Sequence, residues 1–172
     1  MRQDRPALIV SSTSYTKDEN FGILLEAIHK IDEKIKEDPQ YPKMVFVITG
    51  KGPEKAFYEE KIASSKFHKV SIHTMFLSHS NYALLLGSSD LGVSLHTSSS
   101  GLDLPMKVVD MFGCKLPVCA FKFDCIHELV QHEKNGLVFE TPDKLVEQIL
   151  VTKFSQFQLF KLTPFLSCKV SL

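Results

Sequence analysis

Short apolar runs alternate with amphipathic segments along nearly the whole sequence, and this alternation restricts the fold more than any other feature. Residues that alternate between two faces indicate a strand, whereas apolar residues three and four apart share one face of a helix. The apolar runs predict six strands, at residues 7–10, 44–49, 70–73, 91–95, 116–120 and 137–139. Helices are predicted between and after them, at residues 21–35, 53–64, 82–86, 104–112, 126–132 and 142–151.

Cap and turn residues support these boundaries. Asn20 is placed to cap the first helix, and Pro53 suits the first position of the second. Gly87 is expected to end the third helix, and Thr141-Pro142 to begin the last. Strands that alternate with helices form a mostly parallel sheet covered on both faces. We therefore expect a doubly wound α/β fold with a mostly parallel six-stranded sheet, whose ligands bind beyond the carboxyl ends of the strands.

Composition excludes several classes of protein. At 172 residues the chain has room for one domain with a real core. Its 20 basic and 20 acidic residues cancel, which argues against a nucleic-acid partner. No apolar run reaches the ~18 residues of a membrane span, and no signal-peptide core follows the first residues. The cysteines have no paired short spacing and are expected to be buried, reduced thiols.

The segment from His96 to Val118 joins a predicted strand to a predicted helix and is the strongest functional signal. Its loop passes through the small or polar residues Ser98, Ser99, Ser100, Gly101, Leu102 and Asp103. The N-terminus of the following helix carries a partial positive charge and unpaired N–H groups. The loop therefore predicts a cradle for a diphosphate, with a plain surface loop as the alternative. His96 would contact a sugar or a phosphate there, or form a hydrogen bond within the loop.

Two charged residues of the following helix extend this signal. Asp110 is an acid in an otherwise apolar stretch, so it either accepts hydrogen bonds from the paired hydroxyls of a ribose or is simply solvated. Lys107, near the start of the helix, is either a phosphate-binding cation or a solvated lysine. Together with the loop, these residues are typical of a nucleotide diphosphate site.

A second turn, formed by Gly50, Lys51, Gly52 and Pro53, follows the predicted strand at residues 44–49. It is too short for the P-loop pattern. Its backbone is expected to approach a nucleotide base with Lys51 near the phosphates, unless it is a plain strand-to-helix turn.

His127 and His132 resemble the two histidines of a zinc-protease motif, but their spacing is wrong. They are five residues apart, about 140° around a helix, so they could not share one metal ion.

These segments give the chain a family resemblance. From residue 5 to about residue 150 it resembles the C-terminal half of GT-B glycosyltransferases, closely the beta-mannosyltransferases that extend chitobiosyl diphosphate dolichol. The matching segments are residues 47–53, 84–93, 96–114 and 132–139. The thirteen consecutive residues from 96 to 108 are far more specific than a lone glycine motif.

The resemblance implies one Rossmann-like half of a GT-B fold, the half that binds the sugar nucleotide. It implies an inverting mannosyltransferase of N-glycan precursor assembly, on the cytosolic side of the endoplasmic reticulum and without a bound metal. GDP-mannose would be the donor and a dolichol-linked glycan the acceptor, with other dolichol-pathway glycosyltransferases as partners. Beyond the residues named above, the implied binding positions are Thr13, Ser14 and Glu128.

The sequence also departs from this family. Related retaining enzymes carry two glutamates eight positions apart, where this chain has Leu102 and Asp110, with Asp103 at the wrong spacing. Those relatives also have an arginine and a lysine after the first strand, and here hydroxyl side chains of residues 11–16 replace them. The acceptor half has no counterpart in this sequence.

The last residues do not follow the alternation. We divide the chain into a donor-binding domain, residues 1–153, and an unmatched tail, residues 154–172. Phe154, Phe157 and Phe160 have helical spacing, but Pro164 interrupts the pattern. The tail is expected to be either an added, loosely packed helix or a terminus that never packs.

Three functions compete. The chain could be the donor-binding half of a mannosyltransferase that is inactive or weakly active alone. It could be an active transferase whose acceptor half is a separate chain. It could instead be a non-catalytic partner of the dolichol-linked glycosyltransferases. The sequence argues against a nicotinamide-dependent enzyme, because no Gly-x-Gly-x-x-Gly follows the first strand.

Overall fold

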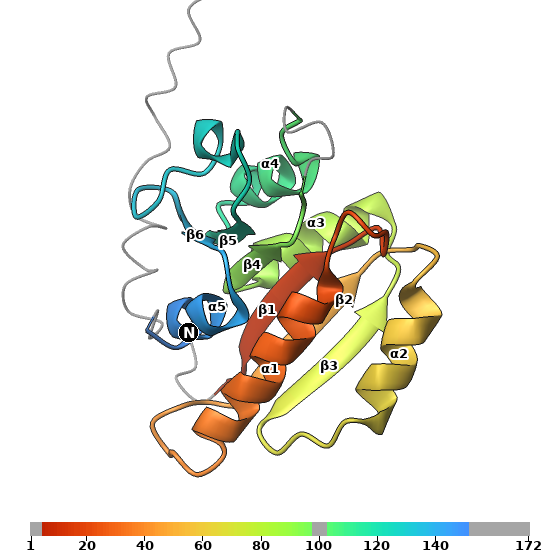
Figure 1. Cartoon of the computed structure of the whole chain (residues 1–172), viewed down its shortest axis with the longest axis vertical. Helices are drawn as coiled ribbons and strands as arrows, with labels where there is room; N and C mark the ends of the chain where they lie inside the picture. Colours follow the sequence, from red (N-terminus) through yellow and green to blue (C-terminus); the bar gives the residue numbers. More distant parts are fainter. Residues whose placement is uncertain (1–4, 98–102, 152–172) are drawn as a thin grey trace, which may run out of the picture.

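The computed structural model describes residues 5–97 and 103–151, which form an α/β domain of three layers (Figure 1). Its strands are β1 (Ala7–Ser12), β2 (Met44–Thr49), β3 (Val70–Met75), β4 (Leu91–Ser94), β5 (Val118–Phe121) and β6 (Gly136–Phe139). Its helices are α1 (Phe21–Ile35), α2 (Lys55–Ser64), α3 (His79–Ser88), α4 (Met106–Gly113), α5 (Pro142–Val151) and the short 3₁₀ helix η1 (Ile126–Glu128).

The six strands form one sheet in the order β3-β2-β1-β4-β5-β6, and every neighbouring pair is parallel. The chain builds outward from β1 through β2 to β3, then returns to place β4 on the other side of β1. The direction of winding therefore reverses between β1 and β4. The doubly wound fold is confirmed. In such folds ligands bind in a crevice at the carboxyl ends of the strands beside this reversal, which are β1 and β4 here.

Helices cover both faces of the sheet. On one face, α1, α2 and α5 contribute to an apolar cluster in which Phe21, Ile28 and Leu145 are fully buried. On the other face, α3, α4 and η1 form a second cluster around Val108 and Met111. The predicted N-cap of α1 is confirmed: the Asn20 side chain accepts a hydrogen bond from the Gly22 N–H at 3.1 Å.

Two predicted helix boundaries are wrong by a few residues. Helix α2 begins at Lys55 instead of Pro53, because the backbone before it is bound elsewhere: the Glu54 N–H donates to the Tyr15 carbonyl at 3.1 Å. Gly87 lies inside α3 and does not end it. The helix stops one residue later, where Ser89 turns to an extended conformation.

The helix predicted at residues 126–132 is also wrong, since only the single 3₁₀ turn η1 forms there. The side chain of Asn135 replaces the missing helical bonds. Its amide nitrogen donates to the Leu129 carbonyl at 3.0 Å, and its oxygen accepts from the Gln131 N–H at 2.7 Å. Such local side-chain bonds compete with helical hydrogen bonds.

Prolines set two further boundaries. Strand β5 begins at Val118 and not at residue 116, because Pro117 has no N–H to donate to the ladder, although its carbonyl accepts from the Gly92 N–H at 2.8 Å. Helix α4 begins at Met106, with Pro105 as its N-cap residue.

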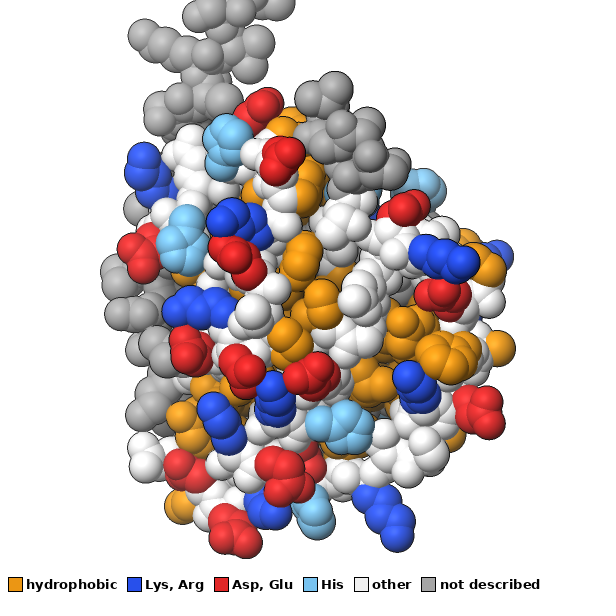
Figure 2. All heavy atoms as spheres, in the orientation of Figure 1, with side chains coloured by type: hydrophobic (Ala, Val, Ile, Leu, Met, Phe, Trp, Pro, Cys, Tyr) orange, Lys and Arg blue, Asp and Glu red, His pale blue; other side chains and the backbone are white. Residues whose placement is uncertain are grey.

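Other sequence predictions concern the cysteines, the surface and the tail. Cys119 and Cys125 are buried free thiols, and Cys114 is partly exposed. On the face shown in Figure 2, acidic and basic side chains are interspersed, without a broad basic patch. Within the described residues, no helix has the length and apolar character to cross a bilayer. The predicted tail, residues 154–172, and the loop residues Ser98, Ser99, Ser100, Gly101 and Leu102 lie outside the described residues.

Candidate functional site

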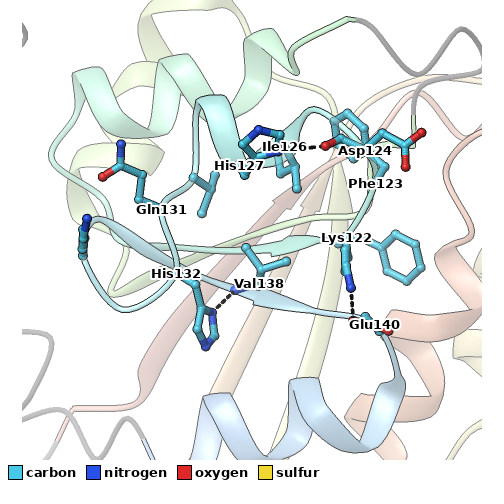
Figure 3. A pocket seen from close by; sticks show the side chains of 12 residues that line it. Lys122, Phe123, Asp124, Ile126, His127, Gln131, His132, Val138 and Glu140 are labelled. Carbon is cyan, nitrogen blue, oxygen red and sulfur yellow. Dashed lines mark hydrogen bonds and ion pairs between the residues drawn. The ribbon is translucent and has the colours of Figure 1, made fainter.

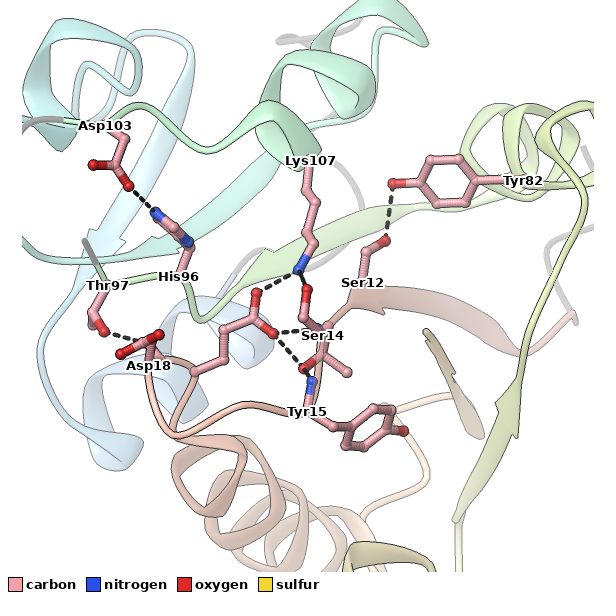
Figure 4. Close-up of polar contacts among 11 residues, drawn as sticks. Ser12, Ser14, Tyr15, Asp18, Tyr82, His96, Thr97, Asp103 and Lys107 are labelled. Carbon is pink, nitrogen blue, oxygen red and sulfur yellow. Dashed lines mark hydrogen bonds and ion pairs between the residues drawn. The ribbon is translucent and has the colours of Figure 1, made fainter. Parts of the chain in front are cut away.

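Two loops meet at the crevice between β1 and β4. One follows β1, and the other joins β4 to α4. Their backbones are joined directly: Glu19 and His96 form an antiparallel bridge, and the Thr97 N–H donates to the Asp18 carbonyl at 3.3 Å. The Thr97 hydroxyl also donates to the Asp18 carbonyl (Figure 4). The loop after β1 and the start of the predicted ligand loop after β4 therefore form one unit at the carboxyl edge of the sheet.

A buried carboxylate lies at the centre of this unit. Glu19 is only 4 % exposed. It accepts hydrogen bonds from the Thr13 hydroxyl at 2.5 Å, from the Ser14 N–H and from the ammonium group of Lys107. Lys107 points from α4 toward Ser14 (Figure 4), and its Nζ also donates to the Ser14 hydroxyl at 3.0 Å. The structure thus brings together Thr13, Ser14 and Lys107, three of the predicted site residues.

Electrostatics keep this carboxylate ionised. Burial alone would raise the pKa of Glu19, because it penalises the charged form. Hydrogen bonds from Lys107, Thr13 and Ser14, with the positive charge of Lys107, outweigh burial and lower the pKa below its ordinary value of 4.5. Glu19 and Lys107 are therefore a charged pair near neutral pH.

The turn after β2 packs on the back of the β1–α1 loop. A Cβ atom added to Gly50 would lie 1.7 Å from the Thr13 carbonyl oxygen, and one added to Gly52 would lie 1.7 Å from that of Ser14. Real Cβ atoms do not approach backbone so closely, so both positions require glycine. This contact gives the two glycines a packing role, whereas the predicted approach to a nucleotide base stays a prediction. Pro53 lies in the turn between them and α2.

Tyr15 adds a strained backbone position to the same loop. Its φ of 47° is in the left-handed region that residues other than glycine seldom adopt. The conformation is held by packing, because its buried ring lies 5.7 Å from that of Phe21. Its N–H donates to the Thr13 hydroxyl at 2.9 Å. Ring packing and this hydrogen bond therefore both hold the loop that carries Ser14.

Lys51 and Lys107 follow the two strands that flank β1 in the sheet. Lys51 follows β2 and Lys107 belongs to the helix after β4, and β1 lies between these two strands. The Lys51 ammonium lies 3.7 Å from the ring centroid of Phe76, which is 58 % exposed. Among the described contacts of Lys51, none joins it to the Glu19–Lys107 pair, so its predicted contact with the phosphates stays a prediction.

Asp110 lies three residues after Lys107, so both project from the same side of α4. The Asp110 side chain is exposed. Close by, the Tyr82 hydroxyl of α3 lies 2.9 Å from that of Ser12 at the end of β1. Burial raises the pKa of Tyr82, and the negative charge of Asp110 raises it further. The acid is therefore available to a ligand at the edge of the crevice, as the predicted ribose contact requires.

His96 and Asp103 lie at the two ends of the loop that leads to α4. The His96 Nε2 is 3.7 Å from a carboxylate oxygen of Asp103 (Figure 4). The His96 ring lies edge-on to that of Phe123, with 5.7 Å between the ring centroids. Both residues belong to the loop unit at the crevice. Their predicted contacts with a ligand stay predictions.

The predicted residue Glu128 makes no described contact with the Glu19–Lys107 pair. It is exposed on η1. The two nearby histidines bind separate backbone groups: the His127 Nδ1 lies 2.8 Å from the Asp124 carbonyl, and the His132 Nδ1 accepts from the Val138 N–H at 2.9 Å. No group of three histidine, cysteine, aspartate or glutamate side chains that could hold a metal ion occurs among residues 5–97 and 103–151.

A hollow lies beside η1, along the connection from β5 to β6 (Figure 3). It has a volume of about 800 Å³, and its lining includes Phe123, Ile126, His127, Gln131 and Val138. Lys122 and Glu140 form an ion pair of 2.6 Å at its edge, with both side chains more than half exposed. None of the predicted site residues that the structure describes lines this hollow.

Sequence reasoning missed Glu19, Tyr15 and Tyr82. Glu19 follows Lys17 and Asp18 in a charged stretch that resembles a solvated loop. The sequence nonetheless contains a signal for Glu19. The hydroxyl-rich loop at residues 11–16 is followed closely by an acid that can accept hydrogen bonds from it.

Comparisons with known proteins agree with this architecture. The family model described as glycosyl transferases group 1 matches residues 2–151. The Arabidopsis thaliana protein named UDP-glycosyltransferase TURAN is 55 % identical over 164 residues, covering 88 % of this chain and 35 % of that protein. The Homo sapiens chitobiosyldiphosphodolichol beta-mannosyltransferase is 56 % identical over 155 residues, covering 90 % and 33 %. This chain therefore spans about a third of the length of these curated relatives.

Among solved structures, a point mutant of S. aureus TarM, in complex with fondaparinux, alpha-GlcNAc-glycerol and UDP, has the same fold. The TM-score is 0.75 at 16 % sequence identity, and the match covers 91 % of this chain and 30 % of that one.

Proposed function

Because the chain belongs to the group 1 glycosyl transferases, we propose that its domain binds the nucleotide diphosphate of a sugar donor between β1 and β4. The observation that carries this proposal is the position of Lys107. Its ammonium lies 3.0 Å from the Ser14 hydroxyl in the crevice where the winding of the sheet reverses. A lysine in the first turn of a helix adds a full positive charge to the partial charge of the helix terminus, and both attract phosphate.

Other residues complete the proposed site. Lys107 and the Ser14 hydroxyl bind the diphosphate, with N–H groups of the loop before α4. Asp110 accepts hydrogen bonds from the ribose hydroxyls, since it is exposed on the same side of α4 as Lys107. Lys51, in the turn after β2, is proposed as a second cation for the phosphates. No metal ion is proposed here, because the lysines supply the positive charge.

We propose GDP-mannose as the donor, on the basis of relatives that are named chitobiosyldiphosphodolichol beta-mannosyltransferases. The complete reaction would transfer mannose to a dolichol-linked acceptor in N-glycan precursor assembly, on the cytosolic side of the endoplasmic reticulum. The similarly close relative named a UDP-glycosyltransferase makes uridine the alternative nucleoside.

Transfer itself requires more than donor binding. The acceptor must be held against the reacting sugar carbon, and the rate advantage of that arrangement is lost without the groups that hold it. We therefore propose that the domain alone binds the donor with little or no transfer. The alternative is a non-catalytic partner of dolichol-linked glycosyltransferases, and this alternative predicts no nucleotide binding.

Calorimetric titration with GDP, GDP-mannose, UDP-glucose and guanosine, without divalent metal, tests the proposal. We expect GDP and GDP-mannose to bind most tightly, UDP-glucose to bind more weakly, and guanosine, which lacks the diphosphate, to bind least. Absence of binding by every nucleotide at millimolar concentration, with the protein folded, would refute donor binding and favour the non-catalytic alternative. A mannosyl-transfer assay on a chitobiosyl lipid then measures any activity of the chain alone.

A further inference from the structure

The buried carboxylate of Glu19 connects three separate parts of the crevice. Its side chain accepts from Thr13 and Ser14 of the β1–α1 loop and from Lys107 of α4. Its backbone forms the bridge to His96 at the end of β4. A charge this deeply buried is costly unless it is paired and hydrogen-bonded, so its partners are held in one arrangement.

Exposure is unequal between the two members of the ion pair. The Glu19 side chain is 4 % exposed, and the Lys107 side chain is 29 % exposed. An anion that enters the crevice from solvent therefore meets the ammonium group before it meets the carboxylate. A lysine ammonium has three N–H donors, and among the described contacts Glu19 and Ser14 use two of them.

The third donor is the one that a ligand would need. A lysine side chain carries considerable rotamer entropy, and ordering it on binding reduces affinity. The hydrogen bonds to Glu19 and Ser14 fix the ammonium before any ligand arrives. The side-chain entropy of Lys107 is therefore lost when the chain folds and not when the ligand binds. A fixed cation at the helix terminus therefore binds a phosphate with higher affinity than a mobile cation does.

We infer that Glu19 is a positioning residue for the nucleotide diphosphate, which holds the Lys107 ammonium beside Ser14 and leaves its outer N–H available to a phosphate oxygen. This inference rests on the proposed function of the domain. Glu19 touches no ligand and acts through Lys107. A purely structural role, in which Glu19 only holds the loops together, predicts a different pattern of binding.

A double-mutant cycle separates the two roles. Glu19→Gln, Lys107→Met and the double variant are titrated with GDP and with guanosine, and their thermal unfolding is measured in parallel. Glu26→Gln is the matched control, because it removes the same charge from an exposed ion pair with Lys30 on α1. If Glu19→Gln melts too low for titration, Glu19→Asp replaces it, since the charge is kept and only the reach is shortened.

We expect Glu19→Gln to weaken GDP binding about fivefold or more, the size of coupling seen between contacting residues, with guanosine binding changed less than about twofold. In the Lys107→Met background, the same change at Glu19 should alter GDP binding less than about twofold, because the group through which it acts is gone. Glu26→Gln should bind GDP as the unmodified chain does.

Other outcomes overturn the inference. Equal losses for GDP and guanosine, an undiminished loss in the Lys107→Met background, or tighter GDP binding by Glu19→Gln would each do so while leaving the proposed function intact. If the unmodified chain binds no GDP, the proposed function fails and this inference fails with it.

Discussion

The crevice between β1 and β4 and the hollow beside η1 differ in how they are built. At the crevice, two loops and a helix N-terminus converge on a charged pair whose carboxylate is buried, and two glycines let a third loop pack against them. The hollow is large, about 800 Å³, but its charged side chains form exposed pairs such as that of Lys122 with Glu140. Exposed pairs contribute little free energy and fix little geometry. The comparison favours the crevice, where separate elements converge, over the hollow as the proposed site for a charged ligand.

The largest expected effect is on the fold of the crevice itself. Gly52→Ala places a methyl group 1.7 Å from the Ser14 carbonyl oxygen, so the β1–α1 loop must shift. We expect a loss of about 2–4 kcal/mol in the free energy of unfolding, measured by chemical denaturation. Gly87→Ala is the control, because open space surrounds that helical position and the change should be neutral or stabilising. Similar free energies of unfolding for both variants would show that the turn at residues 50–53 does not stabilise the β1–α1 loop.

The next effect compares one lysine from each region. Lys107→Met should weaken GDP binding about tenfold or more, because a hydrogen bond to a charged group contributes about 1.5–3 kcal/mol. Lys122→Met, beside the hollow, removes an exposed ion pair and should leave GDP binding unchanged. Calorimetric titration measures both. A larger loss of GDP affinity in the Lys122 variant than in the Lys107 variant would indicate that the ligand binds in the hollow.

Asp110→Asn tests the ribose contact on the same side of α4. The change is nearly isosteric at an exposed position, so the fold should survive. Binding of GDP should weaken about tenfold, because the amide accepts hydrogen bonds less strongly than the carboxylate. The 2′-deoxy form of GDP should bind the variant and the unmodified chain with more similar affinities. Unchanged GDP binding by the variant would remove Asp110 from the site.

The smallest effect is a pH dependence of stability. The pKa of Glu19 is lower in the folded chain than its ordinary value of 4.5, so the unfolded chain takes up this proton first as the pH falls. The stabilisation is therefore fully present above about pH 4.5 and is lost as the pH falls through the lower, folded-state pKa. Urea denaturation between pH 7 and pH 3 should show a smaller acid loss in Glu19→Gln than in the unmodified chain. Parallel curves for the two proteins would contradict this assignment.

The fold could be predicted from the sequence where a local pattern is strong. Strand β2 and helix α1 have the predicted bounds, because a run of β-branched residues and a capped apolar face each determine one structure. The segment after η1 could not be predicted, since the side chain of Asn135 replaces the helical bonds. Apolar periodicity carries no information about that competition.

The site was predictable in its position but not in its construction. The loop before α4, with Lys107 and Asp110, follows from the rule that ligands bind at the carboxyl ends of strands. The burial of Glu19 depends on the contact of residues 18 and 19 with residues 96 and 97, which are far apart in the sequence. An acid in a charged loop is usually solvated, and only the folded chain shows that this one is not.

Amide chemical-shift mapping by NMR, with GDP titrated in the absence of divalent metal, tests the central claim most directly. The account predicts that the largest shifts fall on the β1–α1 loop around Ser14 and on the first turn of α4 around Lys107, with little change in residues 122–134 beside η1. Shifts concentrated in residues 122–134, with none at Ser14 or Lys107, would contradict it.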